Sequence, residues 1–197
     1  MRCTKTFVAV TALLVLLVGC SREPEALRLV AGDVVLAFGD SLTFGTGAAP
    51  EQSYPAVLAG LIGREVVRSG VPGEVSAKGL ARLPLELERV KPALVVLCHG
   101  GNDILRNLPA RRTRENLDAM VKLAHASGAQ VIMLAVPGRL LSPPSYFEDV
   151  AADNGVVLID AVIPDILRDP QLKSDRVHPN AGGYRKIAES VAALLTG

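Results

Sequence analysis

Ser41 stands just after an apolar run, Val34–Phe38, in the stretch Ala-Phe-Gly-Asp-Ser-Leu. A buried strand gains little from a hydroxyl group at its end, whereas the carboxyl edge of a parallel sheet is where reactive groups are presented to ligands. The position therefore makes Ser41 a candidate nucleophile. The short motif alone fits a helix-capping serine equally well, so the hypothesis depends on partners elsewhere in the chain.

His178 is the best candidate for the base that accepts the serine proton. Of the three histidines it is the one with a carboxylate three residues earlier, Asp175, on a loop bounded by Pro179. In Ser-His-Asp chemistry the carboxylate fixes the tautomer of the ring and stabilises the imidazolium that forms as serine attacks. Taken singly, Asp175 also fits a turn cap and His178 an ordinary loop residue, but together with Ser41 they indicate acyl transfer.

Acyl transfer also requires hydrogen-bond donors for the oxyanion of the intermediate. Gly73 offers a backbone amide that a carbonyl group can approach closely, and Asn102 offers a side-chain amide. With the backbone amide of Ser41, these residues form a predicted set of three donors.

The sequence predicts neither a metal nor an organic cofactor. The histidines lack metal-ligand spacing. Cys98 is the one cysteine outside the amino-terminal twenty residues, and one cysteine cannot build a zinc site. His99 has no carboxylate at close spacing and is interpreted as structural. The glycines of residues 45–50 resemble a dinucleotide-binding fingerprint but lack its third glycine.

Short apolar runs separated by helical patterns are expected to position these residues. The runs are continuous, as in strands covered by helices on both faces, and they lie at Val34–Phe38, Glu65–Arg68, Ala93–Cys98, Gln130–Val136 and Val156–Ile159. The alternation predicts an α/β fold: a flavodoxin-like, three-layer α/β/α sandwich with a five-stranded parallel sheet. The four loops with chemical groups then meet at one edge of that sheet.

Helix boundaries follow from capping residues and prolines. Ser53 is expected to open one helix, Thr113 another that stops at Gly128, and Asn180 the last, over Ala181–Leu195. Pro84 is expected to end or kink the helix that follows Gly73.

The amino-terminal segment reads as a targeting signal. Arg2 and Lys5 precede an apolar run that is short for a membrane span, and Leu-Val-Gly-Cys at 17–20 resembles a bacterial lipobox. We expect residues 1–19 to be a signal peptide, Cys20 to carry lipid and residues 20–32 to form a tether. The protein is then exported and lipid-anchored to the cell envelope, on its periplasmic or outer face. An ordinary secretory signal with an incidental Cys20, or an uncleaved anchor, remains the alternative.

Composition limits the remaining possibilities. The 197 residues are 49% hydrophobic and carry a formal net charge of +1, which suits one domain, residues 33–197, and gives no electrostatic argument for nucleic acid.

The chemical groups resemble the four blocks of the GDSL or SGNH hydrolases, named for Ser, Gly, Asn and His. The matching segments are Gly-Asp-Ser-Leu at 39–42, Gly73, Gly-Gly-Asn-Asp at 100–103 and Asp-Arg-Val-His at 175–178. The resemblance is greatest to the bacterial branch of arylesterases and of thioesterase I/lysophospholipase L1-type enzymes. It implies the SGNH fold, Ser41 as nucleophile, His178 as base, Asp175 as its orienting carboxylate, and an oxyanion hole of Ser41, Gly73 and Asn102.

Two segments depart from the family pattern. An Asn usually precedes the glycine of the second block by a few residues, whereas this chain has Arg68-Ser69-Gly70. The segment 137–154 is short. Within it, four apolar residues fit either an acyl groove or simple packing: Leu140, Leu141, Tyr146 and Phe147.

These observations predict a cofactor-independent serine esterase or lipase-type acyl hydrolase that acts on small ester or thioester substrates. Two alternatives stay open: a carbohydrate O-acetylesterase of the cell envelope, and a non-catalytic lipoprotein that binds lipid or glycan in a retained cleft.

Overall fold

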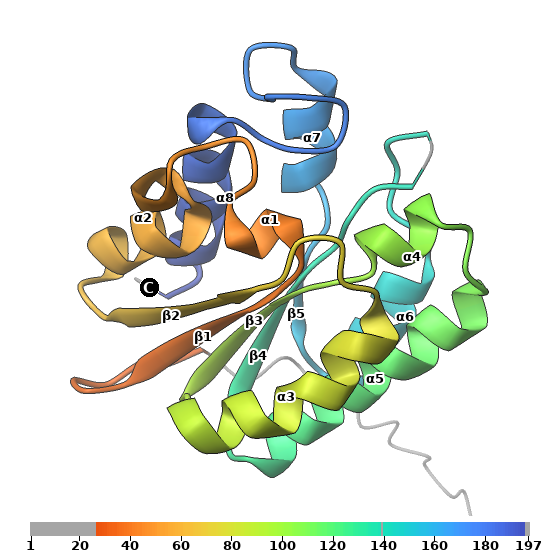
Figure 1. The fold of residues 1–197 in the computed structure, drawn as a ribbon. Helices are drawn as coiled ribbons and strands as arrows, with labels where there is room; N and C mark the ends of the chain where they lie inside the picture. Colours follow the sequence, from red (N-terminus) through yellow and green to blue (C-terminus); the bar gives the residue numbers. More distant parts are fainter. Residues whose placement is uncertain (1–26, 139, 196–197) are drawn as a thin grey trace, which may run out of the picture.

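Five parallel strands form the centre of the protein in the computed structural model, which describes residues 27–138 and 140–195 (Figure 1). Their order is β2-β1-β3-β4-β5, with bounds Val34–Gly39 (β1), Glu65–Gly70 (β2), Leu94–Cys98 (β3), Gln130–Leu134 (β4) and Val157–Ile159 (β5). This is the doubly wound order of flavodoxin-like folds, so the predicted fold class is confirmed. The predicted signal peptide, Cys20 and residues 21–26 of the tether lie outside the described residues.

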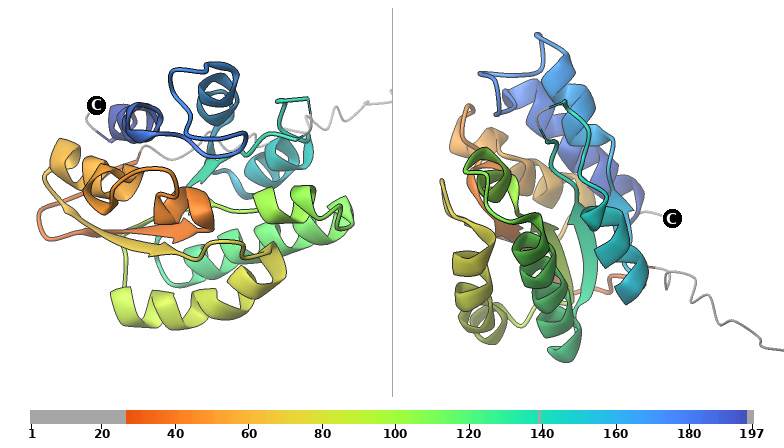
Figure 2. Two further views of the ribbon diagram at one scale, coloured as in Figure 1. Left: turned by 45° about the horizontal axis from the view of Figure 1, so that its top comes forward. Right: turned by 90° about the vertical axis from the view of Figure 1, so that its right-hand side faces the viewer.

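Helices cover both faces of the sheet. Helices α3, α5 and α6 pack on one face, and α2, α7 and α8 lie on the other (Figures 1 and 2). The bounds are Ser41–Phe44 (α1), Pro50–Gln52 (the 3₁₀ helix η1), Tyr54–Ile62 (α2), Ser76–Val90 (α3), Gly101–Leu105 (α4), Ala110–Ala126 (α5), Tyr146–Asn154 (α6), Val162–Arg168 (α7) and Ala181–Ala193 (α8). No helix within the described ranges is both long and apolar enough to cross a bilayer.

The central strands are buried on both faces. Every residue of β3 is buried, as is every residue of β1 after Val34. That double burial is the reason why these segments read as continuous apolar runs instead of alternating ones. Gly39 at the end of β1 pairs in register with Gly70 of β2 and Cys98 of β3, so three strands finish at the same level and release their loops together.

One expected helix start is wrong, and Pro84 does not end its helix. Helix α5 begins at Ala110, and Thr113 lies in its first turn, where its buried hydroxyl faces Asp103 instead of capping the helix. Helix α3 continues through Pro84. Pro84 is exposed, while Leu83 and Leu87 bury their side chains in the core, and this packing holds the helix together despite the missing backbone donor.

Candidate active site

Ser41 is placed by the abrupt change from strand β1 to the short helix α1. The side chain of Asp40 caps this helix by accepting a hydrogen bond from the amide of Leu42 at 3.1 Å. Ser41 is the first helical residue, and its partly exposed hydroxyl stands at the carboxyl edge of the sheet. Asp40 is buried, and burial raises the pKa of its carboxyl group, which hydrogen bonds from Leu42 and Asn102 partly offset.

The predicted base and its carboxylate meet Ser41 across the sheet edge. His178 Nε2 lies 3.0 Å from Ser41 Oγ, and His178 Nδ1 lies 2.7 Å from Asp175 Oδ2. The other carboxylate oxygen, Asp175 Oδ1, accepts the amides of Val177 and His178, each at 2.8 Å. One carboxylate thus holds both the turn and the imidazole ring, and the unbroken chain of hydrogen bonds can move a proton away from Ser41.

The carboxyl group of Asp175 is held in its ionised form. Burial raises its pKa, but the hydrogen bonds from the His178 ring and from the amides of Val177 and His178 outweigh this effect, so the pKa lies below the ordinary value. An ionised Asp175 accepts a hydrogen bond from the Nδ1–H group of His178 and so leaves Nε2 free to receive the proton of Ser41.

Gly73 lies in the loop between β2 and α3, in the left-handed backbone region with φ +75°. The amide of Val71 donates to Gly39 O at 3.1 Å, and the amide of Glu74 donates to Val71 O at 3.1 Å, which closes this turn against the end of β1. The carbonyl of Gly73 accepts Arg106 Nη2 at 2.8 Å. Its amide group is not among these contacts of the turn.

Asn102 projects from the first turn of α4. Its side-chain Nδ2 donates to Asp40 Oδ2 at 3.1 Å. A side-chain amide carries two N–H groups, so this bond orients the group and leaves a second donor for a ligand. Asp103, the next residue, is buried and accepts the amide and hydroxyl of Ser76, which ties α4 to the start of α3.

All the predicted catalytic residues except Asp175 line one cavity of about 270 Å³. Its polar part is formed by Ser41, Gly73, Asn102 and His178 together with Asp40 and Thr46. The rest of the wall is mainly apolar and includes Leu42, Leu105, Val136, Pro137, Leu167 and Val177. Asp175 stands behind the His178 ring, as an orienting carboxylate must.

The four apolar residues of the segment 137–154 do not line this cavity. Tyr146 and Phe147 are buried in α6, Leu141 packs partly against the core and Leu140 is exposed. The packing interpretation is therefore correct for Tyr146 and Phe147. Much of the apolar wall comes instead from Leu105 and Leu167, which sequence reasoning missed because neither belongs to a motif and only the packing of α4 and α7 brings them to the cavity.

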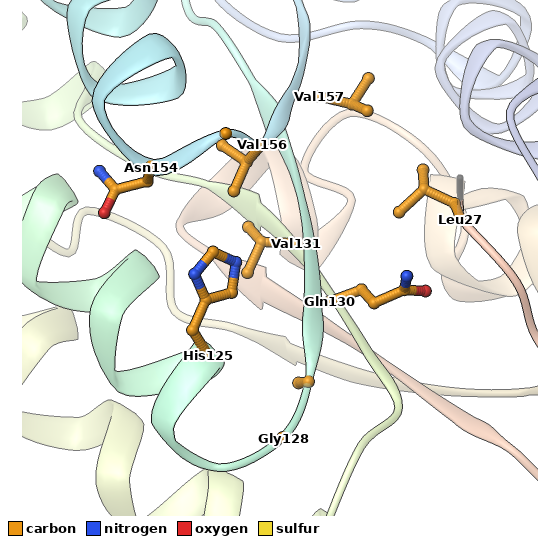
Figure 3. A pocket seen from close by; sticks show the side chains of 10 residues that line it. Leu27, His125, Gly128, Gln130, Val131, Asn154, Val156 and Val157 are labelled. Carbon is orange, nitrogen blue, oxygen red and sulfur yellow. The ribbon is translucent and has the colours of Figure 1, made fainter. Parts of the chain in front are cut away.

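A second cavity lies at the opposite, amino edge of the sheet (Figure 3). Its ten lining residues include Leu27, His125, Gln130 and Asn154, and none is a serine or cysteine. No group of three or more His, Cys, Asp or Glu that could hold a metal ion occurs in the described part of the chain. The site with nucleophilic chemistry is the one at the carboxyl edge.

Sequence reasoning also missed a carboxylate partner of His99. The His99 ring is fully buried, and its Nε2 lies 3.2 Å from Glu74 Oε2. Glu74 pairs in turn with Arg82 through bonds of 3.1 and 2.8 Å. A sequence signal for this pair was available in the position of Glu74. It directly follows Gly73 in a loop at the sheet edge, where a carboxylate must either face solvent or pair with a buried polar side chain.

Comparisons with known proteins agree with this geometry. Residues 37–186 match the GDSL-like Lipase/Acylhydrolase family. Esterase TesA of Pseudomonas aeruginosa is 32% identical over 91% of this chain and 96% of its own. Thioesterase 1/protease 1/lysophospholipase L1 of Escherichia coli is 28% identical over 85% and 86%. The psychrotrophic esterase EstA from Pseudoalteromonas sp., inhibited by monoethylphosphonate, superposes with a TM-score of 0.74 at 25% identity, over 84% of this chain and 100% of that one.

Proposed function

Because the chain belongs to the GDSL-like lipase/acylhydrolase family, we propose that it hydrolyses carboxylic esters or thioesters through an acyl-enzyme on Ser41. The observation that carries this proposal is the run of hydrogen bonds from Ser41 Oγ to His178 and on to Asp175, at 3.0 and 2.7 Å. Such an arrangement activates a hydroxyl group that is unreactive by itself at neutral pH.

In the proposed mechanism, Ser41 Oγ attacks the carbonyl carbon while His178 Nε2 takes the hydroxyl proton. The carbonyl oxygen becomes an oxyanion, which the amides of Ser41 and Gly73 and the side chain of Asn102 stabilise. When the intermediate collapses, His178 returns its proton to the departing alcohol or thiol. A water molecule then gives one proton to His178 and adds its hydroxyl group to the acyl carbon. As the second intermediate collapses, His178 returns that proton to Ser41 Oγ, which releases the carboxylic acid and restores the free serine.

The cavity supports acyl groups of modest length. Its volume of about 270 Å³ lies just below the usual range of ligand pockets, which is roughly 300 to 1,000 Å³. The apolar side chains of Leu105, Val136 and Leu167 suit an aliphatic chain better than a carbohydrate, so we favour simple esters and thioesters over the envelope O-acetylesterase alternative.

The first test is hydrolysis of p-nitrophenyl esters from acetyl to palmitoyl by residues 27–197, with Ser41→Ala as the control. We expect activity with an optimum at short to medium acyl chains and no activity above background for Ser41→Ala. An optimum at acetyl, with turnover of acetylated oligosaccharides, favours the O-acetylesterase. Failure of an alkylphosphonate to label Ser41 in the folded protein supports the non-catalytic binding protein instead.

We further propose that Cys20 carries lipid and anchors the enzyme to the cell envelope. The lipobox-like residues 17–20 and the preceding basic and apolar residues support this proposal. Metabolic labelling with radioactive palmitate is expected to mark the full-length protein and not Cys20→Ala. Equal labelling of both proteins, or of neither, contradicts it.

A further inference from the structure

His99 connects the two loops that carry the Gly73 amide and the Asn102 side chain. Its Nε2 faces Glu74 Oε2 at 3.2 Å, and Glu74 directly follows Gly73. Its Nδ1 accepts the amide of Gly100 at 3.2 Å, two residues before Asn102. One buried ring therefore bonds to both loops. The ring is not among the residues that line the catalytic cavity.

The two bonds require one form of the imidazole ring. Nδ1 accepts the Gly100 N–H, so it carries no proton, and the proton of the neutral ring lies on Nε2, where it donates to Glu74. A ring protonated at both nitrogens, or the other neutral tautomer, places N–H against N–H at Gly100. The neutral Nε2–H tautomer thus satisfies both loops together.

The ring is also confined by packing. A Cβ atom added to Gly79 of α3 would lie 2.3 Å from His99 Nε2, so only glycine leaves room for the imidazole here. The Phe38 ring lies on another side, with its centroid 6.0 Å from that of the imidazole. The fully buried ring is thus enclosed between α3 and β1.

Glu74 is fixed from its other side by Arg82. Arg82 pairs with both carboxylate oxygens of Glu74, donates to Ser69 Oγ at 2.5 Å and lies over the Phe38 ring, with its guanidinium carbon 4.2 Å from the centroid. Ser69 belongs to the stretch in which the family pattern has an asparagine. In this chain the support of the Gly73 loop thus comes from an arginine on α3 and a histidine after β3.

We propose that His99 and Glu74 are positioning residues that hold the Gly73 amide and the Asn102 side chain in register as one oxyanion hole, with Arg82 fixing Glu74. The inference rests on the proposed function, because it assigns a role in stabilising the intermediate formed on Ser41. Oxyanion donors act only when they point at the place where charge develops, and a displacement of about 1 Å can reduce the rate about 100-fold.

The primary test compares two substitutions of the buried ring. His99→Leu fills the space without bonding to either loop, whereas His99→Gln keeps one donor for Glu74 and one acceptor for Gly100. We expect His99→Leu to lower kcat about 10- to 100-fold with KM little changed, and His99→Gln to restore most of kcat. His125→Leu, at the exposed histidine beside the amino-edge cavity, is the matched control and should leave kcat unchanged.

A double-mutant cycle separates positioning from general destabilisation. If His99 acts through the oxyanion donors, His99→Leu lowers kcat much less in an Asn102→Ala background than in the wild type. The same fold loss in both backgrounds, or equal losses for His99→Leu and His99→Gln, overturns the proposal. Active-site titration with the phosphonate restricts every rate to folded enzyme.

Amide hydrogen exchange provides a readout that does not depend on turnover. Exchange at Gly100 and in the 71–74 turn should be faster in His99→Leu and near the wild-type rate in His99→Gln. Where His99→Leu does not fold, Glu74→Leu, which removes the acceptor of the His99 Nε2–H group, is used for the same measurements, with the same expectation of loss. Unchanged exchange overturns the proposal that His99 and Glu74 hold the two loops together. A wild-type protein without hydrolytic activity contradicts the proposed function, and the exchange result then still tests whether His99 holds the loops.

Discussion

At the scale of single residues, Asp175 uses its two oxygens for different tasks. One receives the His178 ring and the other receives two backbone amides of the turn. The separation of tasks means that the turn and the charge can be tested independently. Burial opposes ionisation, but these hydrogen bonds keep the pKa of Asp175 below its ordinary value, so the carboxylate is charged across the neutral range.

Asp175→Asn should preserve the turn at residues 175–178 and lose most of the hydrolytic activity. The asparagine oxygen still accepts the amides of Val177 and His178, but its NH₂ group facing Nδ1 favours the wrong tautomer of the ring. We expect kcat for the preferred p-nitrophenyl ester to fall about 10³- to 10⁴-fold, with a melting temperature close to that of the wild type. A loss under tenfold would show that Asp175 does not orient the base.

Asn102→Ala should lower kcat strongly although Ser41, His178 and Asp175 remain in place. The substitution removes one oxyanion donor, a loss of about 3–4 kcal/mol of transition-state stabilisation, or roughly 10²- to 10³-fold in kcat. Asp40 keeps its bond to the Leu42 amide, so helix α1 stays capped. Steady-state kinetics gives the rate, and retained labelling of Ser41 by phosphonate shows that the nucleophile is intact.

At the scale of elements, Asn180 joins helix α8 to the loop that carries the base. Its Oδ1 caps the helix by accepting the Gly183 amide at 3.2 Å, while its Nδ2 donates to Gln171 O at 2.8 Å. The loop is closed further by an antiparallel bridge between Lys173 and Pro179. The helix start and the loop that carries His178 therefore share one hydrogen-bonding side chain.

Asn180→Ala and Asn180→Asp should separate these two contributions. The alanine loses the cap and the loop bond, and we expect about 1–2 kcal/mol less stability in urea unfolding. We expect both variants to have a reduced kcat, because neither donates to Gln171 O in the loop that carries His178. The aspartate keeps an acceptor for the helix cap, so it should recover most of the stability that the alanine loses. Equal stability of the two variants would mean that the cap contributes little.

At the scale of the whole molecule, the bridge below the site joins several layers of the fold. Arg82 on α3 and His99 after β3 both bond to Glu74, and Arg82 also donates to Ser69 on β2. Burial raises the pKa of Glu74, but hydrogen bonds from His99 and Arg82 outweigh it and lower the pKa to about 2 from an ordinary 4.5. Unfolding exposes this carboxylate to water and returns its pKa to the ordinary range.

The lowered pKa of Glu74 predicts that the free energy of unfolding decreases in acid. Between pH 4.5 and 2 the unfolded chain binds a proton that the folded protein does not, so this contribution is present above pH 4.5 and is lost as pH falls toward 2. The shift corresponds to about 3 kcal/mol. Urea unfolding should show Glu74→Gln less stable than the wild type at pH 7, with the gap narrowing toward pH 2. A constant gap would contradict the prediction.

The sequence by itself determined the strands, their covering helices and the identity of the chemical groups. Short continuous apolar runs that alternate with helical patterns favour parallel strands covered by helices, and four loops at the carboxyl ends of such strands share one edge. Ser41, Asp175 and His178 could be assigned for this reason, because local motifs and a general rule of sheet topology were sufficient.

Only the tertiary structure decided which distant side chains surround and support those groups. The Leu105 and Leu167 walls of the cavity, the bridge from His99 to Glu74, and the course of α3 through Pro84 all depend on packing between segments far apart in the chain. A sequence pattern reports the preferences of neighbouring residues, whereas these features arise from burial and hydrogen bonding across layers, which exist only after the sheet and its helices have come together.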